Sequence, residues 1–250
     1  MKTEMYCYTH NRDRTVLPPI FDSWLDPDHT AVVCIDMHRG HLDPEGTCPA
    51  PRAIAKIEAH NEFHRAARAL DIPVIMVQHW QRFGGIDDIN SKKSTRRANW
   101  RYLYELYLPY NPRMDEHSWE GTKWLDLLVE TGPNDYYVRT KKRLSAFYPT
   151  DLEFLLHNLD IENVVITGTY TDACDLSTAF DAANRDFRVI VPRDVVAGYS
   201  EEAENAALLI VSLHLGLVVD AAPLIEEWAA RRGIEVPGES VAEAPVSGRV

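Results

Sequence analysis

Cysteine is scarce in this sequence, and none of the cysteines has the spacing of a metal-binding or disulfide motif. The four cysteines are far apart in the chain and form no C-x-x-C pair: Cys7, Cys34, Cys48 and Cys174. This distribution argues against a dense disulfide framework and against a cysteine-based zinc site. Because isolated thiols are preserved in a reducing compartment, we predict a cytoplasmic protein.

Long apolar runs and an excess of positive charge are also missing. No segment approaches the roughly 20 apolar residues of a membrane-spanning helix, and no apolar stretch follows the first charges as in a secretory signal. The net charge of −12 opposes binding to nucleic acid or to an anionic membrane surface. We therefore expect neither as a partner. The first predicted strand is not followed by Gly-x-Gly-x-x-Gly, which argues against a dinucleotide-binding protein.

The sequence does contain a regular alternation of apolar and amphipathic segments. Continuous apolar runs predict six buried strands, at 30–37, 72–77, 136–139, 164–167, 187–191 and 217–219. Several intervening segments carry apolar residues three and four positions apart, which is typical of helices. This order predicts a three-layer αβα domain of the α/β class, Rossmann-like, with a mainly parallel sheet of about six strands.

The composition divides the chain into four parts. Residues 1–29 are polar and irregular, and we interpret them as an arm that lies over the domain or reaches a partner subunit. The main domain covers 30–232. It contains a long polar and aromatic excursion at 81–136, of a length usually associated with a lid or a specificity region. Residues 233–250 are poor in apolar side chains, which predicts a flexible tail.

Cys174 is the candidate nucleophile, because it lies just past a strand end in the first turn of a predicted helix. The apolar face of this predicted helix consists of Leu176, Ala179, Phe180 and Ala183. Unpaired N–H groups and the positive end of the helix dipole meet at such a position. Both favour a thiolate over a thiol. On this stretch alone, a small core residue is an equally good interpretation.

Two charged residues could act with this thiol. Asp36 ends the first predicted strand, where open α/β sheets place their sites; the alternative is a loop acid that caps a turn. Lys141 begins the segment Lys-x-Arg-x-Ser-Ala-Phe, although a lysine pair such as Lys141–Lys142 is more often a solvated surface feature.

Taken in order, these three motifs resemble the isochorismatase-like cysteine hydrolases. That family holds nicotinamidases, N-carbamoylsarcosine amidases, ureidoacrylate hydrolases and biuret hydrolases, and the resemblance covers residues 30–230. It implies a catalytic triad of Asp36, Lys141 and Cys174 that cleaves the C–N bond of a small linear amide or ureido compound through a thioester. It also implies a cis peptide at Thr169–Tyr170, with the N–H groups of Tyr170 and Cys174 as the oxyanion hole.

The sequence departs from the family pattern at two positions near the nucleophile. Tyr170 stands where relatives usually have a small residue, and Asp175 stands where many have an aliphatic one. The nicotinamidase branch carries a metal-binding Asp-x-His motif after the second strand. Here the corresponding stretch is Val77-Gln78-His79-Trp80, without the acid, so we predict no catalytic metal and no cofactor.

The substrate pocket is the least determined part of the site. For its walls the candidates are Trp80, Trp100 and Tyr170, and for a polar anchor Arg97 or Arg143. Because relatives form oligomers, we expect a homo-oligomer, either a dimer or a tetramer. Two other functions stay open: a non-catalytic αβα scaffold, and a vinyl-ether hydrolase of the isochorismatase type, whose nucleophile position is not a cysteine.

Overall fold

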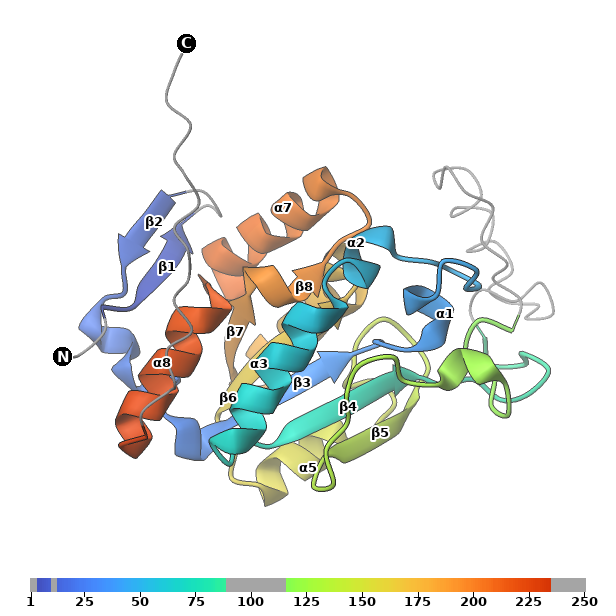
Figure 1. Ribbon diagram of the computed structural model, residues 1–250, viewed down its shortest axis with the longest axis horizontal. Helices are drawn as coiled ribbons and strands as arrows, with labels where there is room; N and C mark the ends of the chain where they lie inside the picture. The colour runs from blue at the N-terminus through green and yellow to red at the C-terminus, as the bar shows by residue number, and fades with distance from the viewer. Residues whose placement is uncertain (1–3, 10–12, 89–115, 235–250) are drawn as a thin grey trace, which may run out of the picture.

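A seven-stranded sheet forms the centre of the molecule, and the strand pairings described within it are parallel. The structure is a computed structural model that describes residues 4–9, 13–88 and 116–234. The main path runs β5 (Tyr136–Lys141), β4 (Val74–His79), β3 (Thr30–Ile35), β6 (Asn163–Thr169), β7 (Arg188–Pro192) and β9 (Gly216–Val219) (Figure 1). The seventh strand, β8 (Val196–Ala197), pairs with β6. The predicted architecture is confirmed. The strand beyond the predicted six is β8, whose two residues are too short to appear as an apolar run.

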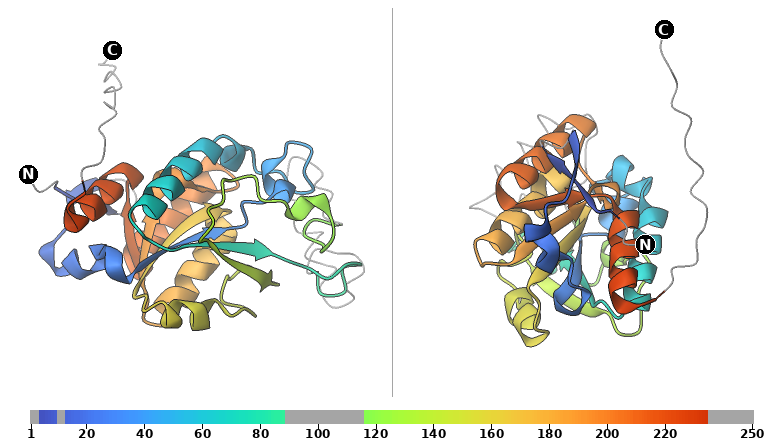
Figure 2. Two further views of the ribbon diagram at one scale, coloured as in Figure 1. Left: turned by 60° about the horizontal axis from the view of Figure 1, so that its bottom comes forward. Right: turned by 90° about the vertical axis from the view of Figure 1, so that its left-hand side faces the viewer.

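Helices cover both faces of the sheet and complete the three layers (Figures 1 and 2). One face is covered by α3 (Ile57–Ala69) and α8 (Ala221–Arg232), which contact each other through the rings of Phe63 and Trp228. The helices of the other face are α5 (Leu152–Asn158), α6 (Leu176–Ala183) and α7 (Glu201–Ile210). Two short helices follow β3: α1 (Arg39–Leu42) and α2 (Pro51–Ile54).

Each face of the sheet has its own apolar core. In β3, Val32 and Cys34 belong to the core under α3 and α8, whereas Ala31, Val33 and Ile35 belong to the opposite core. Successive side chains of a strand point to opposite faces. A strand covered on both sides must therefore be apolar at every position, which is why these strands read as continuous runs.

The first 29 residues are more ordered than the irregular arm that the sequence predicts. They contain an antiparallel hairpin of β1 (Tyr6–Thr9) and β2 (Asp13–Val16), followed by 3₁₀ helices at Pro19–Leu25 and Pro27–His29. β1 lies against β9, and the Tyr8 hydroxyl donates to Asp220 Oδ2 at 2.9 Å. This segment therefore packs over its own domain, the first of the two placements considered for it.

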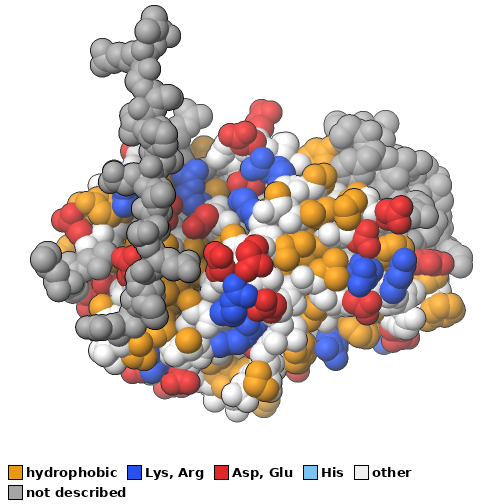
Figure 3. All heavy atoms as spheres, viewed as in Figure 1, with side chains coloured by type: hydrophobic (Ala, Val, Ile, Leu, Met, Phe, Trp, Pro, Cys, Tyr) orange, Lys and Arg blue, Asp and Glu red, His pale blue; other side chains and the backbone are white. Residues whose placement is uncertain are grey.

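Parts of the expected excursion and tail lie outside the described residues, namely 89–115 and 235–250, and with them Arg97 and Trp100. In the described remainder of the excursion, the backbone is irregular apart from a 3₁₀ turn at Lys123–Leu125. None of the helices in the described ranges has both the length and the apolar character needed to cross a membrane. On the face shown in Figure 3, basic side chains are interspersed with acidic ones.

Gly168 allows two strands to meet closely at the carboxyl edge of the sheet. Its φ of 129° is in a region that favours glycine, and a Cβ there would lie 2.2 Å from the carbonyl oxygen of Ile35. The ends of β3 and β6 can approach only because this side chain is missing. The residues that follow these two strands, Asp36 and Tyr170, are thereby brought to one place.

The core under α8 provides a test of this packing. Trp228 is fully buried, so Trp228→Ala should lower the free energy of unfolding by about 3–5 kcal/mol, through lost apolar burial and the cavity left behind. Phe154→Ala is the matched control, because that aromatic side chain is 73% exposed and its loss should cost less than about 0.5 kcal/mol. Urea unfolding measures both. Equal losses in the two variants would contradict the described core.

Candidate active site

Asp36, Lys141 and Cys174 meet at the carboxyl edge of the sheet, although they are far apart in the sequence. Lys141 Nζ lies 2.6 Å from Asp36 Oδ2 and 3.3 Å from Cys174 Sγ. Asp36 follows β3 with a φ of 56°, a conformation that is uncommon outside glycine and is often found at functional sites. Lys141 is the last residue of β5, and all three side chains are buried. One ammonium group thus joins a carboxylate to a thiol.

The backbone around Cys174 is held by contacts from a separate segment. Cys174 lies in a π-helical turn, Thr171–Asp175, that leads into α6, and the Thr169–Tyr170 peptide just before it is cis. Thr178 donates its hydroxyl to the Cys174 carbonyl at 2.7 Å and accepts from the Ala146 N–H at 2.9 Å. The Ser-Ala-Phe segment therefore positions the turn that carries the thiol.

The buried pair of Asp36 and Lys141 keeps both members charged. Burial alone would raise the pKa of Asp36, but the Lys141 ammonium and the other groups around the carboxylate together hold that pKa below its usual range. Burial likewise opposes the charge on Lys141, and the Asp36 carboxylate and the Cys174 sulfur raise its pKa in spite of this. The second oxygen of Asp36 accepts the His79 backbone N–H at 2.6 Å, which further fixes the carboxylate.

The Cys174 thiol is protonated at rest, contrary to the expectation from its place at a helix start. Burial raises its pKa well above the ordinary value, the Lys141 ammonium lowers it only in part, and the Asp36 carboxylate raises it again. The side chain is 8% exposed, so water cannot solvate a thiolate there. The sulfur therefore needs a base to become nucleophilic, and the nearby carboxylate is that of Asp36, which Lys141 Nζ links to the sulfur.

The surroundings of Asp175 oppose a second negative charge beside the thiol. Its side chain is buried, and neither carboxyl oxygen has a hydrogen-bond partner among the described residues. Burial, followed by repulsion from Asp36 and Asp172, raises the pKa of Asp175 well above its usual range. Burial therefore favours the protonated form of this group, which weakens the conflict that the sequence suggested.

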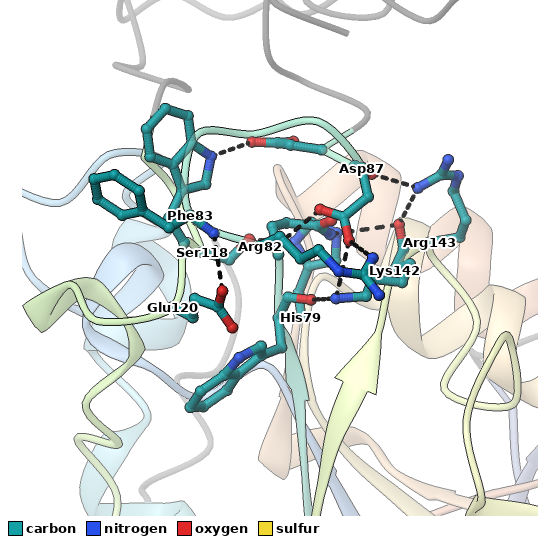
Figure 4. A network of polar contacts seen from close by, with 12 residues as sticks. His79, Arg82, Phe83, Asp87, Ser118, Glu120, Lys142 and Arg143 are labelled. Atoms are coloured by element: carbon teal, nitrogen blue, oxygen red, sulfur yellow. Dashed lines mark hydrogen bonds and ion pairs between the residues drawn. The ribbon is translucent and has the colours of Figure 1, made fainter.

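Lys142 and Arg143 contact the neighbouring loop that carries Asp87 (Figure 4). Lys142 Nζ contacts the Trp80 carbonyl and lies 3.3 Å from Asp87 Oδ2. Arg143 donates to the backbone carbonyls of Asp87 and Lys142, at 3.0 and 2.6 Å. Of the two adjacent lysines, only Lys141 reaches the thiol. Arg143, a candidate substrate anchor, is engaged in holding this loop.

The other two described pocket candidates lie in different places. Trp80 lines a hollow with Gln78, Tyr137 and Arg139, which includes no member of the triad. The Tyr170 hydroxyl donates to the Cys48 and Pro49 carbonyls, both at 3.2 Å. Tyr170 therefore joins the turn before the nucleophile to the loop after β3, whereas Trp80 is not brought to the sulfur.

The end of β4 does not offer the ligands of a nicotinamidase-type metal site. His79 Nδ1 lies 2.7 Å from Ser118 Oγ, and its Nε2 lies 2.5 Å from the Gln81 amide, so both ring nitrogens are engaged (Figure 4). Gln78 donates its amide to the Leu125 carbonyl at 2.7 Å. The prediction of no catalytic metal was based on the end of β4. The side chains there are engaged with other protein groups and do not fit a metal ion.

Three buried histidines that sequence reasoning did not select gather beside the triad. His38, His41 and His117 each present one ring nitrogen within 4.8 Å of the other two. The ring of His41 also meets that of Tyr170 edge-on, at a centroid distance of 5.1 Å. The spacing His-x-x-His directly after Asp36 was a visible signal. His117 had none, because it stands alone in the irregular excursion.

Comparison with known proteins identifies the family. The Isochorismatase domain matches residues 30–223, which is most of the chain. The chain belongs to the isochorismatase family. Its membership makes it an isochorismatase-family hydrolase, and the match covers every strand of the main sheet together with the Asp36, Lys141 and Cys174 positions.

Two curated relatives and one solved structure show how far the similarity extends. The uncharacterized isochorismatase family protein PncA of Bacillus subtilis is 37% identical over 113 residues, covering 42% of this chain and 61% of that protein. The ureidoacrylate amidohydrolase RutB of Methylobacterium radiotolerans is 29% identical over 245 residues, covering 90% of this chain and 86% of that protein. The structure of a cysteine hydrolase from Pseudomonas syringae pv. phaseolicola superposes with a TM-score of 0.70 at 22% identity, covering 82% of this chain and 94% of that chain. This isochorismatase-family hydrolase therefore shares its fold with that structure.

The raised pKa of Asp175 leads to a prediction about how the stability of the protein depends on pH. A carboxyl group with a raised folded-state pKa binds its proton more tightly in the folded protein than in the unfolded chain. Its contribution to stability is therefore lost as the pH rises above the unfolded value of about 3.9. Asp175→Asn removes this loss, so the variant should gain stability relative to the parent between about pH 4 and pH 7.

Urea unfolding at a series of pH values measures this gain. Asp151→Asn, at an exposed position, is the control and should show no comparable gain. A difference between parent and Asp175→Asn that stays constant across the series would mean that Asp175 is ionised in the folded protein.

Proposed function

We propose that this isochorismatase-family hydrolase is a cysteine-dependent amidohydrolase that cleaves the C–N bond of a small linear amide or ureido compound. The observation that carries the proposal is the position of Lys141 Nζ, which contacts both Asp36 Oδ2 and Cys174 Sγ. A buried thiol that contacts an ammonium group, which itself contacts a charged carboxylate, has a base nearby for its proton and a cation beside the sulfur. These are the requirements of an activated sulfur nucleophile.

In the first half of the reaction, Asp36 accepts the thiol proton as the sulfur attacks the carbonyl carbon of the substrate. Lys141 stays protonated and stabilises the negative charge that develops on the sulfur. The tetrahedral intermediate collapses when Asp36 returns the proton to the leaving nitrogen. The C–N bond breaks, an amine or ammonia departs, and the acyl group remains on Cys174 as a thioester.

In the second half, water attacks the thioester and Asp36 accepts a proton from it. The thiolate departs and recovers that proton, so the acid product leaves and the triad returns to its starting state. The oxyanion of both intermediates would be held by the N–H groups of Tyr170 and Cys174. Their position at the cis peptide and in the turn that carries the sulfur supports this assignment.

This chain is similar to RutB, a ureidoacrylate amidohydrolase, along most of the length of both chains. This similarity supports the amide or ureido class of substrate. A vinyl-ether hydrolase is disfavoured because that reaction does not use a cysteine at the nucleophile position. A non-catalytic scaffold would have no need of a buried ion pair in contact with a thiol, since removing a charge pair from water is costly.

The proposal includes a homo-oligomer, either a dimer or a tetramer, in the cytoplasm. The family resemblance supports the oligomer, and light scattering on the purified protein tests it. All four cysteines are free thiols in the structure, which suits a reducing compartment.

The nucleophile can be tested directly. Cys174→Ala should abolish hydrolysis of amide and ureido substrates, measured as ammonia release over a substrate panel, while circular dichroism shows an intact fold. Cys34→Ala is the matched control, because Cys34 is an equally buried thiol in β3, packed in the core. Ammonia release that survives in Cys174→Ala would rule out the thioester route.

The adjacent lysines separate the catalytic role from a structural one. Lys141→Ala should lower kcat on the order of 10⁴-fold or more, because the three groups act as a unit. Asp36→Asn should have a similar effect, and combining it with Cys174→Ala should add little further loss. Lys142→Ala should be mild, since that side chain contacts Trp80 and Asp87. A dead Lys142→Ala with an active Lys141→Ala would reverse the assignment.

A further inference from the structure

The three histidines beside the triad come from two segments that are distant in sequence. His38 and His41 lie at the start and inside of α1, directly after β3, and His117 lies in the described end of the excursion. Ring centroids are 4.8 Å apart for His38 and His41, 5.4 Å for His38 and His117, and 4.4 Å for His41 and His117. The rings therefore form a closed triangle.

In each histidine, one ring nitrogen is held by an oxygen of the protein. His38 Nδ1 lies 3.0 Å from the Trp124 carbonyl, and His41 Nδ1 lies 2.8 Å from the Cys48 carbonyl. A carbonyl oxygen only accepts hydrogen bonds, so these two Nδ1 atoms carry the proton and each Nε2 keeps its lone pair. His117 Nδ1 lies 2.7 Å from the Thr47 hydroxyl, which can accept in the same way.

The remaining ring nitrogens are left without donors. The Nε2 of His38 is closed off from solvent and has no hydrogen-bond partner among the described residues. No described residue donates to the Nε2 of His41 or His117 either. A buried acceptor without a donor is costly, as at His38 Nε2, and the rings of His41 and His117 meet it there. An electron-pair acceptor bound between them would satisfy all three at once.

We propose that His38, His41 and His117 bind one divalent transition-metal cation, such as Zn²⁺, through their Nε2 atoms. Neutral imidazole is the commonest protein ligand for such ions. Metal-binding histidines usually donate their other ring N–H to a carbonyl or another oxygen, which is the arrangement around these three rings. Tetrahedral coordination at about 2.0–2.1 Å requires nitrogens about 3.4 Å apart. Binding would therefore draw the rings inward by on the order of 1 Å.

Three protein ligands leave one coordination position open for water or a substrate atom. The site adjoins the triad, because His38 is two residues from Asp36 and His41 contacts the ring of Tyr170. The open position would hold a carboxylate or carbonyl oxygen of the substrate and orient it toward Cys174. This role rests on the proposed amidohydrolase function, whereas the binding of the ion does not. The inference replaces the expectation of no metal, which was based on the end of β4.

The test uses the full-length protein, stripped with a chelator, dialysed, and titrated with Zn²⁺ by calorimetry, with bound metal counted by mass spectrometry. We expect one Zn²⁺ per chain, and the Co²⁺-loaded protein should show the visible absorption of a four-coordinate site. His117→Ala should weaken Zn²⁺ binding by on the order of 100-fold or more, and Thr47→Val, which spares every ligand, by about 10-fold or more.

Two controls separate this site from others. His60→Gln should bind Zn²⁺ like the parent: His60 is also buried, with Nδ1 on a carbonyl and an unpartnered Nε2, but lies outside the triangle. Cys174→Ala should also bind like the parent, which excludes zinc bound at the thiol.

No Zn²⁺ bound by the parent, or equal binding by the parent, His117→Ala and Thr47→Val, would overturn the site. An active enzyme without bound metal would leave the amidohydrolase proposal standing. A Zn²⁺-binding protein that hydrolyses no amide would leave only the metal site.

Discussion

The buried ion pair between Asp36 and Lys141 is the constraint on which the site depends. Two charges have been taken out of water, and each is stable only because the other is 2.6 Å away. Their separation is set by the sheet, because β4 lies between the strands that carry them and supplies the His79 N–H to the same carboxylate. The pKa of the thiol, raised mainly by burial, is further adjusted by the two charges of the pair. The parallel sheet thus sets the positions of the charged groups in the site.

The sequence predicted the fold because continuous apolar runs mark strands buried on both faces. The ends of parallel strands meet at one edge, which made Asp36 and Cys174 candidate site residues. Lys141 was assigned from the family resemblance, because a lysine pair alone indicates a solvated surface, and the resemblance also supplied the grouping of the three residues. The hairpin at Tyr6–Thr9 and Asp13–Val16 was missed because two four-residue strands are too short to show a clear alternation.

Properties that depend on three-dimensional packing could not be predicted in this way. The protonated state of Cys174 results from its burial, which outweighs the helix-start effect visible in the sequence. Trp80 follows His79 directly, and adjacent residues of a strand point to opposite sides, so one position decides whether a side chain faces the triad. His117 meets His38 and His41 only through the fold, since an irregular segment gives no periodicity from which to place it.

The location of Lys141 on β5 has a consequence for local stability. Among the strands in the described residues, β5 is the outermost of the sheet, and β4 is the one that pairs with it. Strands of this kind separate from the sheet in partial openings that need less free energy than global unfolding. Opening of the end of β5 separates Lys141 from Asp36, so this opening is opposed by loss of the ion pair as well as by lost backbone hydrogen bonds. The Asp36 carboxylate therefore helps to hold the edge strand to the sheet through Lys141. The rate of amide exchange in β5 accordingly reports whether this ion pair is formed.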